Sequence, residues 1–119
     1  MSSTAYVVVK TNQFRVRHLE SGREGTFDAR PPFTSARMLV GRFSVAGPLL
    51  KRAMKEIVQG SFFKVAPRVL IHPMEMSEGG LCEVEDRLLH ELALGAGAAK
   101  VVVWAGSQPL SDAEVLAKF

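Results

Sequence analysis

Three short segments near the start of the chain have the residue patterns of β-strands. Residues 5–9 are a continuous apolar run, whereas residues 14–18 alternate, with Phe14, Val16 and His18 on one side and Arg15 and Arg17 on the other. That period of two is typical of a half-buried strand, and residues 24–29 are the third predicted strand. Thr11, Asn12 and Gln13 separate the first two segments, and the Ser21-Gly22 pair precedes the third, as expected of tight turns. The pattern therefore predicts an antiparallel meander of three strands.

The middle of the chain changes to the three- and four-residue spacing of an amphipathic helix. Its apolar positions are Leu49, Leu50, Ala53, Met54, Ile57 and Val58. Ser44 is a residue type that caps helix N-termini and Gly60 is typical of a helix end, so the pattern predicts a helix between them. Before it, the apolar residues 38–40 predict a short strand.

A second apolar stripe predicts a longer helix over residues 81–95. The stripe consists of Leu81, Val84, Leu88, Leu92 and Gly95, with Leu89 beside it. The apolar segments 68–71 and 100–104 on either side of this helix are predicted strands. Ser111 and Glu114 have the spacing of a capping box, which predicts a final helix over residues 112–119.

The predicted order of elements is βββαβαβα, in a single domain that spans residues 1–119. Strand–helix–strand crossovers are right-handed and make their strands parallel. The predicted fold class is therefore α/β. Its mixed five-stranded sheet joins an antiparallel meander to two parallel strands, and helices cover both faces.

Composition is that of an ordinary soluble globular domain, since 47% of the residues are hydrophobic and 23% are charged. The net charge is +3, with Arg and Lys gathered in residues 1–60 and acidic residues in 75–91. This distribution suits either two solvated faces of opposite sign or a basic surface for an acidic partner, a membrane or nucleic acid. With one cysteine, no signal sequence and no apolar run near the ~20 residues that span a bilayer, we expect a cytoplasmic protein without a membrane span.

Several segments in the second half of the chain resemble one family. They are Ser61-Phe62-Phe63, the run 67–71 followed by Pro73, Val84-Glu85 with Arg87 and Glu91, the run 93–98, the strand 101–103 and Pro109. These residues are similar to the bacterial actin homologue MreB, of the rod shape-determining family, over residues 45–110 and more weakly in the opening hairpin. The resemblance implies a ribonuclease H-like fold, as in subdomain IA of actin-like ATPases, and a role in bacterial cell shape or cytoskeletal organisation.

The resemblance also implies parts of an ATPase site that this sequence lacks. The family's first strand supplies an Asp for the metal-bound water network and a Gly in the phosphate-binding turn. These positions fall on Val7 and Val9, and only Asn12 matches. Glycine lets backbone N–H groups approach phosphate. The sequence also ends at Phe119, around where the family continues into a second, adenosine-binding domain.

We therefore predict a stand-alone half-domain that is not an enzyme and serves as a protein-interaction module. It has no predicted catalytic residue, metal site or cofactor, and ATP binding is not expected. The candidates for a phosphate contact are Lys10, Thr11 and Asn12, although such a tripeptide is more typical of a solvated turn. The alternative function is a nucleotide- or metal-dependent enzyme of ribonuclease H-like fold, or a nucleic-acid-binding domain.

The remaining candidates for chemistry are dispersed along the chain. They are the histidines His18, His72 and His90, the carboxylates Asp28, Glu75, Glu78 and Asp112, and the thiol of Cys82. The histidines are too scattered for a metal site, and His72 is best placed because it ends a strand. A two-metal nuclease needs an acidic residue on the first strand, and residues 5–9 have none. Cys82 lies near a helix N-terminus but has no adjacent histidine as a base.

Two interaction surfaces follow from the meander. Its arginines, interleaved with phenylalanines, are Arg15, Arg17, Arg23, Arg30, Arg37 and Arg42 with Phe27, Phe33 and Phe43. That mixture is found in proteins that bind single-stranded nucleic acid, but phenylalanines more often belong to a core. The turn at residues 20–25 and the strand that leads into it, residues 14–18, predict a free sheet edge. Two copies would join sheets there or meet through residues 49–58, so a homodimer and a monomer are equally open.

Overall fold

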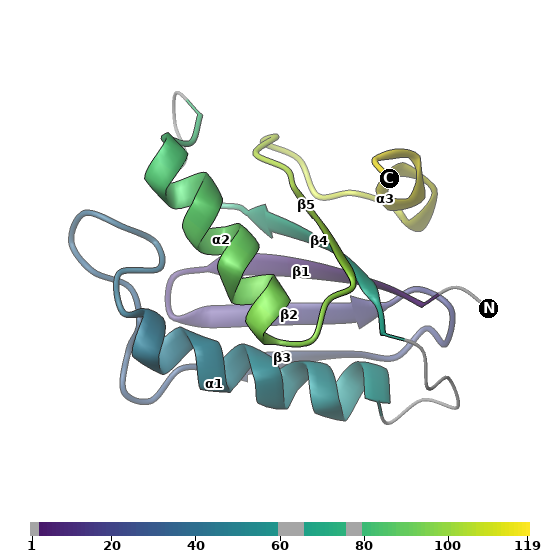
Figure 1. Cartoon of the computed structure of the whole chain (residues 1–119), viewed down its shortest axis with the longest axis horizontal. Helices are drawn as coiled ribbons and strands as arrows, with labels where there is room; N and C mark the ends of the chain where they lie inside the picture. The colour runs from purple at the N-terminus through teal and green to yellow at the C-terminus, as the bar shows by residue number, and fades with distance from the viewer. Residues whose placement is uncertain (1–2, 60–65, 76–79) are drawn as a thin grey trace.

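The computed structural model describes residues 3–59, 66–75 and 80–119, and it contains one five-stranded sheet (Figure 1). The strands are β1 (Thr4–Lys10), β2 (Gln13–His18), β3 (Glu24–Asp28), β4 (Arg68–Pro73) and β5 (Lys100–Val103). They lie in the order β3-β2-β1-β4-β5. β1 pairs antiparallel with β2 and β2 with β3, whereas β1–β4 and β4–β5 are parallel. The predicted α/β class and mixed sheet are confirmed.

Helices cover both faces of this sheet, as predicted. α1 (Phe43–Met54) continues into the π-helical turn η1 (Lys55–Gln59), and it packs with α2 (Glu83–Gly95) on one face. The short α3 (Asp112–Ala117) packs on the other face through Val115. Figure 1 shows α1 running along β3, so that this helix covers the meander half of the sheet.

The central strand β1 contributes to both cores because its side chains alternate between the two faces. Val7 and Val9 are fully buried against the α1–α2 face, while Tyr6 and Val8 belong to the smaller core under α3. On the α1–α2 face, Phe14 stacks on Phe33 with ring centroids 4.9 Å apart, which attaches the segment after β3 to the sheet. Each face of β1 is therefore closed by a different part of the chain.

The start of α1 and the segment before it differ from the prediction. The helix begins at Phe43 with Arg42 as its N-cap residue and without a capping side chain, so Ser44 is an exposed residue of the first turn. The predicted strand at residues 38–40 is wrong. Its backbone bonds locally instead: Thr34 Oγ1 donates to the Leu39 carbonyl at 2.7 Å. The predicted helix end at Gly60 lies outside the described residues.

The buried stripe of α2 is rotated relative to the prediction. Leu89, Leu92 and Ala93 face the core, whereas Val84 is 66% exposed and Gly95 is exposed. Both sets satisfy helical spacing, and the alanine allows close contact with the neighbouring elements β4, β5 and α1.

The predicted strand at residues 100–104 ends one residue earlier and forms a sheet edge, so Val101 is buried while Val102 and Val103 are only partly covered. In the described ranges, no helix combines the length and apolarity needed to cross a bilayer.

Truncating Leu92 and Val84 separately tests which of these two positions of α2 faces the core. Leu92→Ala should lower the free energy of unfolding by about 3 kcal/mol, because it leaves a cavity at a 1% exposed site. Val84→Ala, the matched control, should change it by less than about 0.5 kcal/mol. Urea unfolding followed by circular dichroism measures both. Equal losses for the two variants would contradict the observed orientation of α2.

Candidate functional site

β3 is one of the two outer strands of the sheet, and its outer edge faces away from β2. The His18 N–H donates to the Arg23 carbonyl and the Ala29 N–H donates to the Asn12 carbonyl, both at 2.8 Å. In the antiparallel register, the N–H and C=O groups of alternate β3 residues therefore point to β2. Those of Glu24, Thr26 and Asp28 point outward, and they have no partner among the residues that the structure describes.

A groove of about 640 Å³ opens between the end of this edge and α1. It is lined by residues 28–31 and by Ser44, Val45, Pro48, Leu49 and Arg52. Within the described ranges, the exposed guanidiniums of Arg30 and Arg52 form no ion pair or hydrogen bond. Asp28, which also lines the groove, accepts a hydrogen bond on Oδ1 from Gln13 Nε2 at 2.9 Å. The groove therefore combines an apolar floor with two available positive charges and one carboxylate that is bonded to Gln13.

A second hollow, of about 440 Å³, lies on the opposite face of the same strands. Its walls include Val8, Arg15, Glu24, Thr26 and Pro109. α3 covers the β1, β4 and β5 side of this face through Val115, so the polar side chains of β2 and β3 are left uncovered. β3 thus has open space beside both of its faces.

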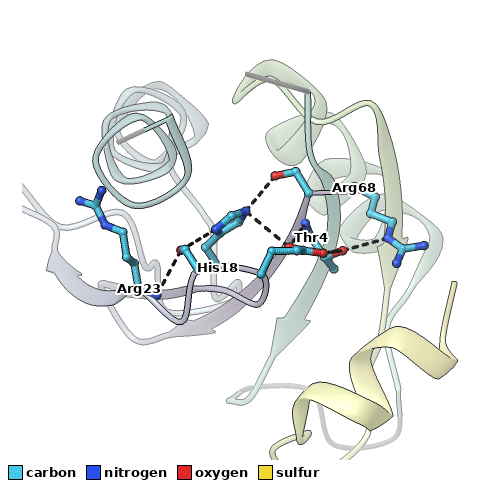
Figure 2. A network of polar contacts seen from close by, with 7 residues as sticks. Thr4, His18, Arg23 and Arg68 are labelled. Carbon is cyan, nitrogen blue, oxygen red and sulfur yellow. Dashed lines mark hydrogen bonds and ion pairs between the residues drawn. The ribbon is translucent and has the colours of Figure 1, made fainter. Parts of the chain in front are cut away.

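A buried polar network holds the hairpin that presents β3 (Figure 2). His18 is fully buried, with Nδ1 2.7 Å from Ser21 Oγ and Nε2 2.9 Å from Ser3 Oγ. Ser21 Oγ also accepts from the Arg23 N–H at 3.3 Å, which shapes the turn into β3. Arg23 then reaches across to η1, where its Nη2 donates to the Glu56 carbonyl at 2.9 Å. The spacing between β3 and the helix is therefore fixed at the hairpin end.

The same network ties the hairpin to the first residues of β1. Glu20 accepts from both the N–H and the Oγ1 of Thr4, at 2.6 and 2.8 Å, and Arg68 Nε donates to Thr4 Oγ1 at 2.9 Å. Figure 2 shows Thr4 of β1 between His18 of β2 and Arg68 of β4, the two strands that flank β1.

Ser3 and His18 have the residue types of a nucleophile and its base, but their environment is closed. Ser3 is 4% exposed and His18 is fully buried. A nucleophile needs access to its substrate. Burial also lowers the pKa of His18, against the opposing charge of Glu20, so the imidazole is neutral near pH 7. We interpret the arrangement as a structural lock on β1 and β2.

His72 forms a second buried connection, under α3. Its Nε2 lies 2.7 Å from the Gly106 carbonyl, which can only accept, so Nε2 carries the proton. Nδ1 then accepts from the Tyr6 hydroxyl at 2.7 Å, and that oxygen in turn accepts from the Leu110 N–H at 3.1 Å. Burial lowers the pKa of His72 and raises that of Tyr6, which keeps both neutral. The pair attaches the segment after β5 to the sheet.

The three phosphate candidates lie in the β1–β2 turn. Two backbone N–H groups of this turn are already bonded to side-chain oxygens of the chain. The Thr11 N–H and Oγ1 donate to the Glu75 carboxylate at 3.2 and 2.6 Å, and the Asn12 N–H donates to Thr34 Oγ1 at 2.9 Å. Asn12 adopts a positive φ of 53°, as its place in the turn predicts. The bonds from Thr11 lower the pKa of Glu75. A phosphate near Lys10 would have to displace Glu75.

The structure does not bring the other candidates together. Among the described residues, no three side chains form a group that could hold a metal ion. Asp28 bonds to Gln13, Glu75 to Thr11, and Asp112 pairs with Arg17 at 2.9 Å, while Glu78 lies outside the described ranges. Cys82 is an exposed thiol at the start of α2, and His90 is half-buried on the same helix.

The arginines and phenylalanines also separate. Arg17 is held by Asp112 and Arg23 by Glu56, whereas Phe33 is fully buried and Phe43 is 44% exposed at the start of α1. The apolar side chains of residues 49–58, through which a homodimer contact was predicted, are buried against the chain's own sheet. The predicted edge at the strand leading into residues 20–25 is wrong, because β2 pairs on both sides and the free edge is that of β3. Sequence reasoning missed the groove, because Arg30 and Arg52 meet only after folding.

Comparison with curated proteins finds a relative of almost the same length. The chain is 37% identical over 123 residues to the uncharacterized protein YjaA of Escherichia coli (strain K12), and the match covers 97% of this chain and 95% of that protein. No protein-family model matches the chain.

Because His18 and His72 are buried, we expect the free energy of unfolding to decrease below pH 6.5. Burial lowers both pKa values from 6.5, so on acidification the unfolded chain takes up protons before the folded chain does. The free energy of unfolding should therefore decrease as the pH falls from 6.5, by up to about 1.4 kcal/mol per pH unit for each histidine, and level off below the folded pKa values. Urea unfolding over this range measures the slope. His72→Gln, which cannot titrate, should reduce the slope, and a flat wild-type profile would contradict the assignment.

Proposed function

The chain belongs to the family of the Escherichia coli protein YjaA, and we propose that it is a non-catalytic, actin-like half-domain that serves as a protein-interaction module. The observation that carries the proposal is the free edge of β3 beside the groove lined by Arg30 and Arg52. Exposed sheet edges are templates for pairing with another chain, and natural proteins usually blunt or cover them. Here no described residue covers the edge, and hollows lie beside both faces of β3.

The sheet order supports the ribonuclease H-like part of the proposal. The observed sheet, a three-stranded meander continued by two parallel strands, is compatible with the ribonuclease H-like fold that the resemblance to MreB implies. By that resemblance, the process in which the module acts is bacterial cell shape or cytoskeletal organisation, in the cytoplasm.

The environment of β1 supports the absence of ATPase activity. Val7 and Val9 occupy the positions where the resemblance would require a carboxylate and a glycine, and both are fully buried in the main core. A carboxylate at Val7 would be surrounded by apolar side chains, at the cost of burying a charge. The dispersed carboxylates likewise favour interaction over metal-dependent chemistry.

Two measurements test this function. Calorimetric titration with ATP and magnesium should give no binding heat, because the turn donors are already bonded to Glu75 and Thr34. Micromolar binding would instead support the nucleotide-dependent alternative.

In the native host, a photo-cross-linking residue at Thr26 should capture a discrete protein. The same residue at Val84, which is exposed on α2 away from the edge, is the control. Cross-links of equal pattern at both positions, or none at Thr26, would overturn the proposal.

A further inference from the structure

We propose that the edge of β3 binds an extended segment of a different protein as a sixth strand, with apolar side chains and one carboxylate facing α1. This inference rests on the proposed interaction function and specifies the chemistry of its partner. The groups that would bond to this strand are the backbone N–H and C=O groups of Glu24, Thr26 and Asp28, which point outward. Each can bond to a strand laid alongside, as in other cases of strand addition.

The groove sets what one face of the added strand must carry. Side chains on that face would lie next to Phe27, which is half-buried, and against Val45 and Leu49 of α1. The hairpin end is closed, since a Cβ at Gly25 would come within 3.0 Å of Ile57 Cδ1. Apolar side chains therefore fit at the end of β3 that faces the groove. There, Arg30 and Arg52 offer a carboxylate two charged donors.

The opposite face requires a different chemistry. Side chains of the added strand would lie beside Glu24, Thr26 and Asp28, so basic or neutral polar residues suit that side. The partner segment thus alternates apolar and basic residues, with an acidic residue at the groove end of its apolar face.

The carboxylates of Glu24 and Asp28 argue against a second copy of this chain at the edge. In a twofold antiparallel pairing centred on Thr26, Glu24 of each copy would lie opposite Asp28 of the other. Like charges directly opposite across a sheet are destabilising. The edge therefore favours a partner of complementary charge over self-pairing.

Synthetic peptides of about nine residues test the inference, because this length matches an edge strand. Two peptide series alternate valine with lysine. In each, one glutamate replaces a valine, near the N-terminus in one series and near the C-terminus in the other, so that both strand directions are tested. Binding to the full chain is measured by fluorescence anisotropy, and its location by amide chemical shifts. We expect one of the two series to bind and to change the amide chemical shifts of β3 and α1. A peptide with lysine in place of the glutamate should bind more weakly.

Two pairs of variants check the contacts. Thr26→Pro removes an outward N–H without removing a bond to β2, and should weaken binding at least about tenfold, whereas Thr26→Ala should not. Arg52→Glu should weaken it about fivefold. Lys51→Glu makes the same charge change on α1 outside the groove and should have a smaller effect. If Thr26→Pro fails to fold, the comparison of Arg52→Glu with Lys51→Glu tests the inference instead.

The outcomes separate this inference from the broader function. Cross-links at Thr26 in the host, together with no binding of either peptide series or with shifts away from β3, would overturn the strand-addition inference and leave the interaction module standing. Self-association that Thr26→Pro abolishes would show that a second copy is the occupant, and would also overturn it. If neither cross-links nor peptide binding occur, the interaction function itself fails.

Discussion

The structure depends on the pairing of β1 with a neighbour on each side. β1 bonds antiparallel to β2 and parallel to β4, so it joins the meander to the crossover part of the chain. Its side chains are buried on both faces, which leaves no position for a charge along its interior. Polar groups appear instead at its two ends, where Thr4 bonds to Glu20 and the turn after Lys10 bonds to Glu75. The interaction site that we propose accordingly lies at the margin of the sheet and not at its centre.

Much of the fold could be predicted because its elements carry local signals. The apolar run of β1, the alternation in β2 and the capping box of Ser111 and Glu114 depend only on neighbouring residues, and the structure reproduces them. The prediction for α2 was less accurate, since hydrophobic spacing gave no weight to Ala93 and placed Val84 in the core. The start of α1 was wrong because Ser44 has the right chemistry for a cap but lies within the first helical turn.

The candidate site was less predictable than the fold, because it is made by residues distant in sequence. A free edge near residues 20–25 was a local inference, but its groove requires Arg30 and Arg52 to lie beside the same strand. The partners of the buried histidines were equally hidden: His18 meets Ser3, and His72 meets Tyr6 and Gly106. No periodicity relates these positions, since they depend on how the strands are ordered in the sheet.

That strand order has a consequence for synthesis on the ribosome. The meander is translated before α1 and β4, and its contacts are between neighbouring segments, which form quickly. Until β4 emerges, β1 is itself an open margin, and its apolar residues, including Val7 and Val9, lack their cover. Nascent chains in that state are exposed to mispairing with one another. Prompt arrival of the crossover segment, or a chaperone acting at this stage, thus determines how much newly made protein reaches its native form.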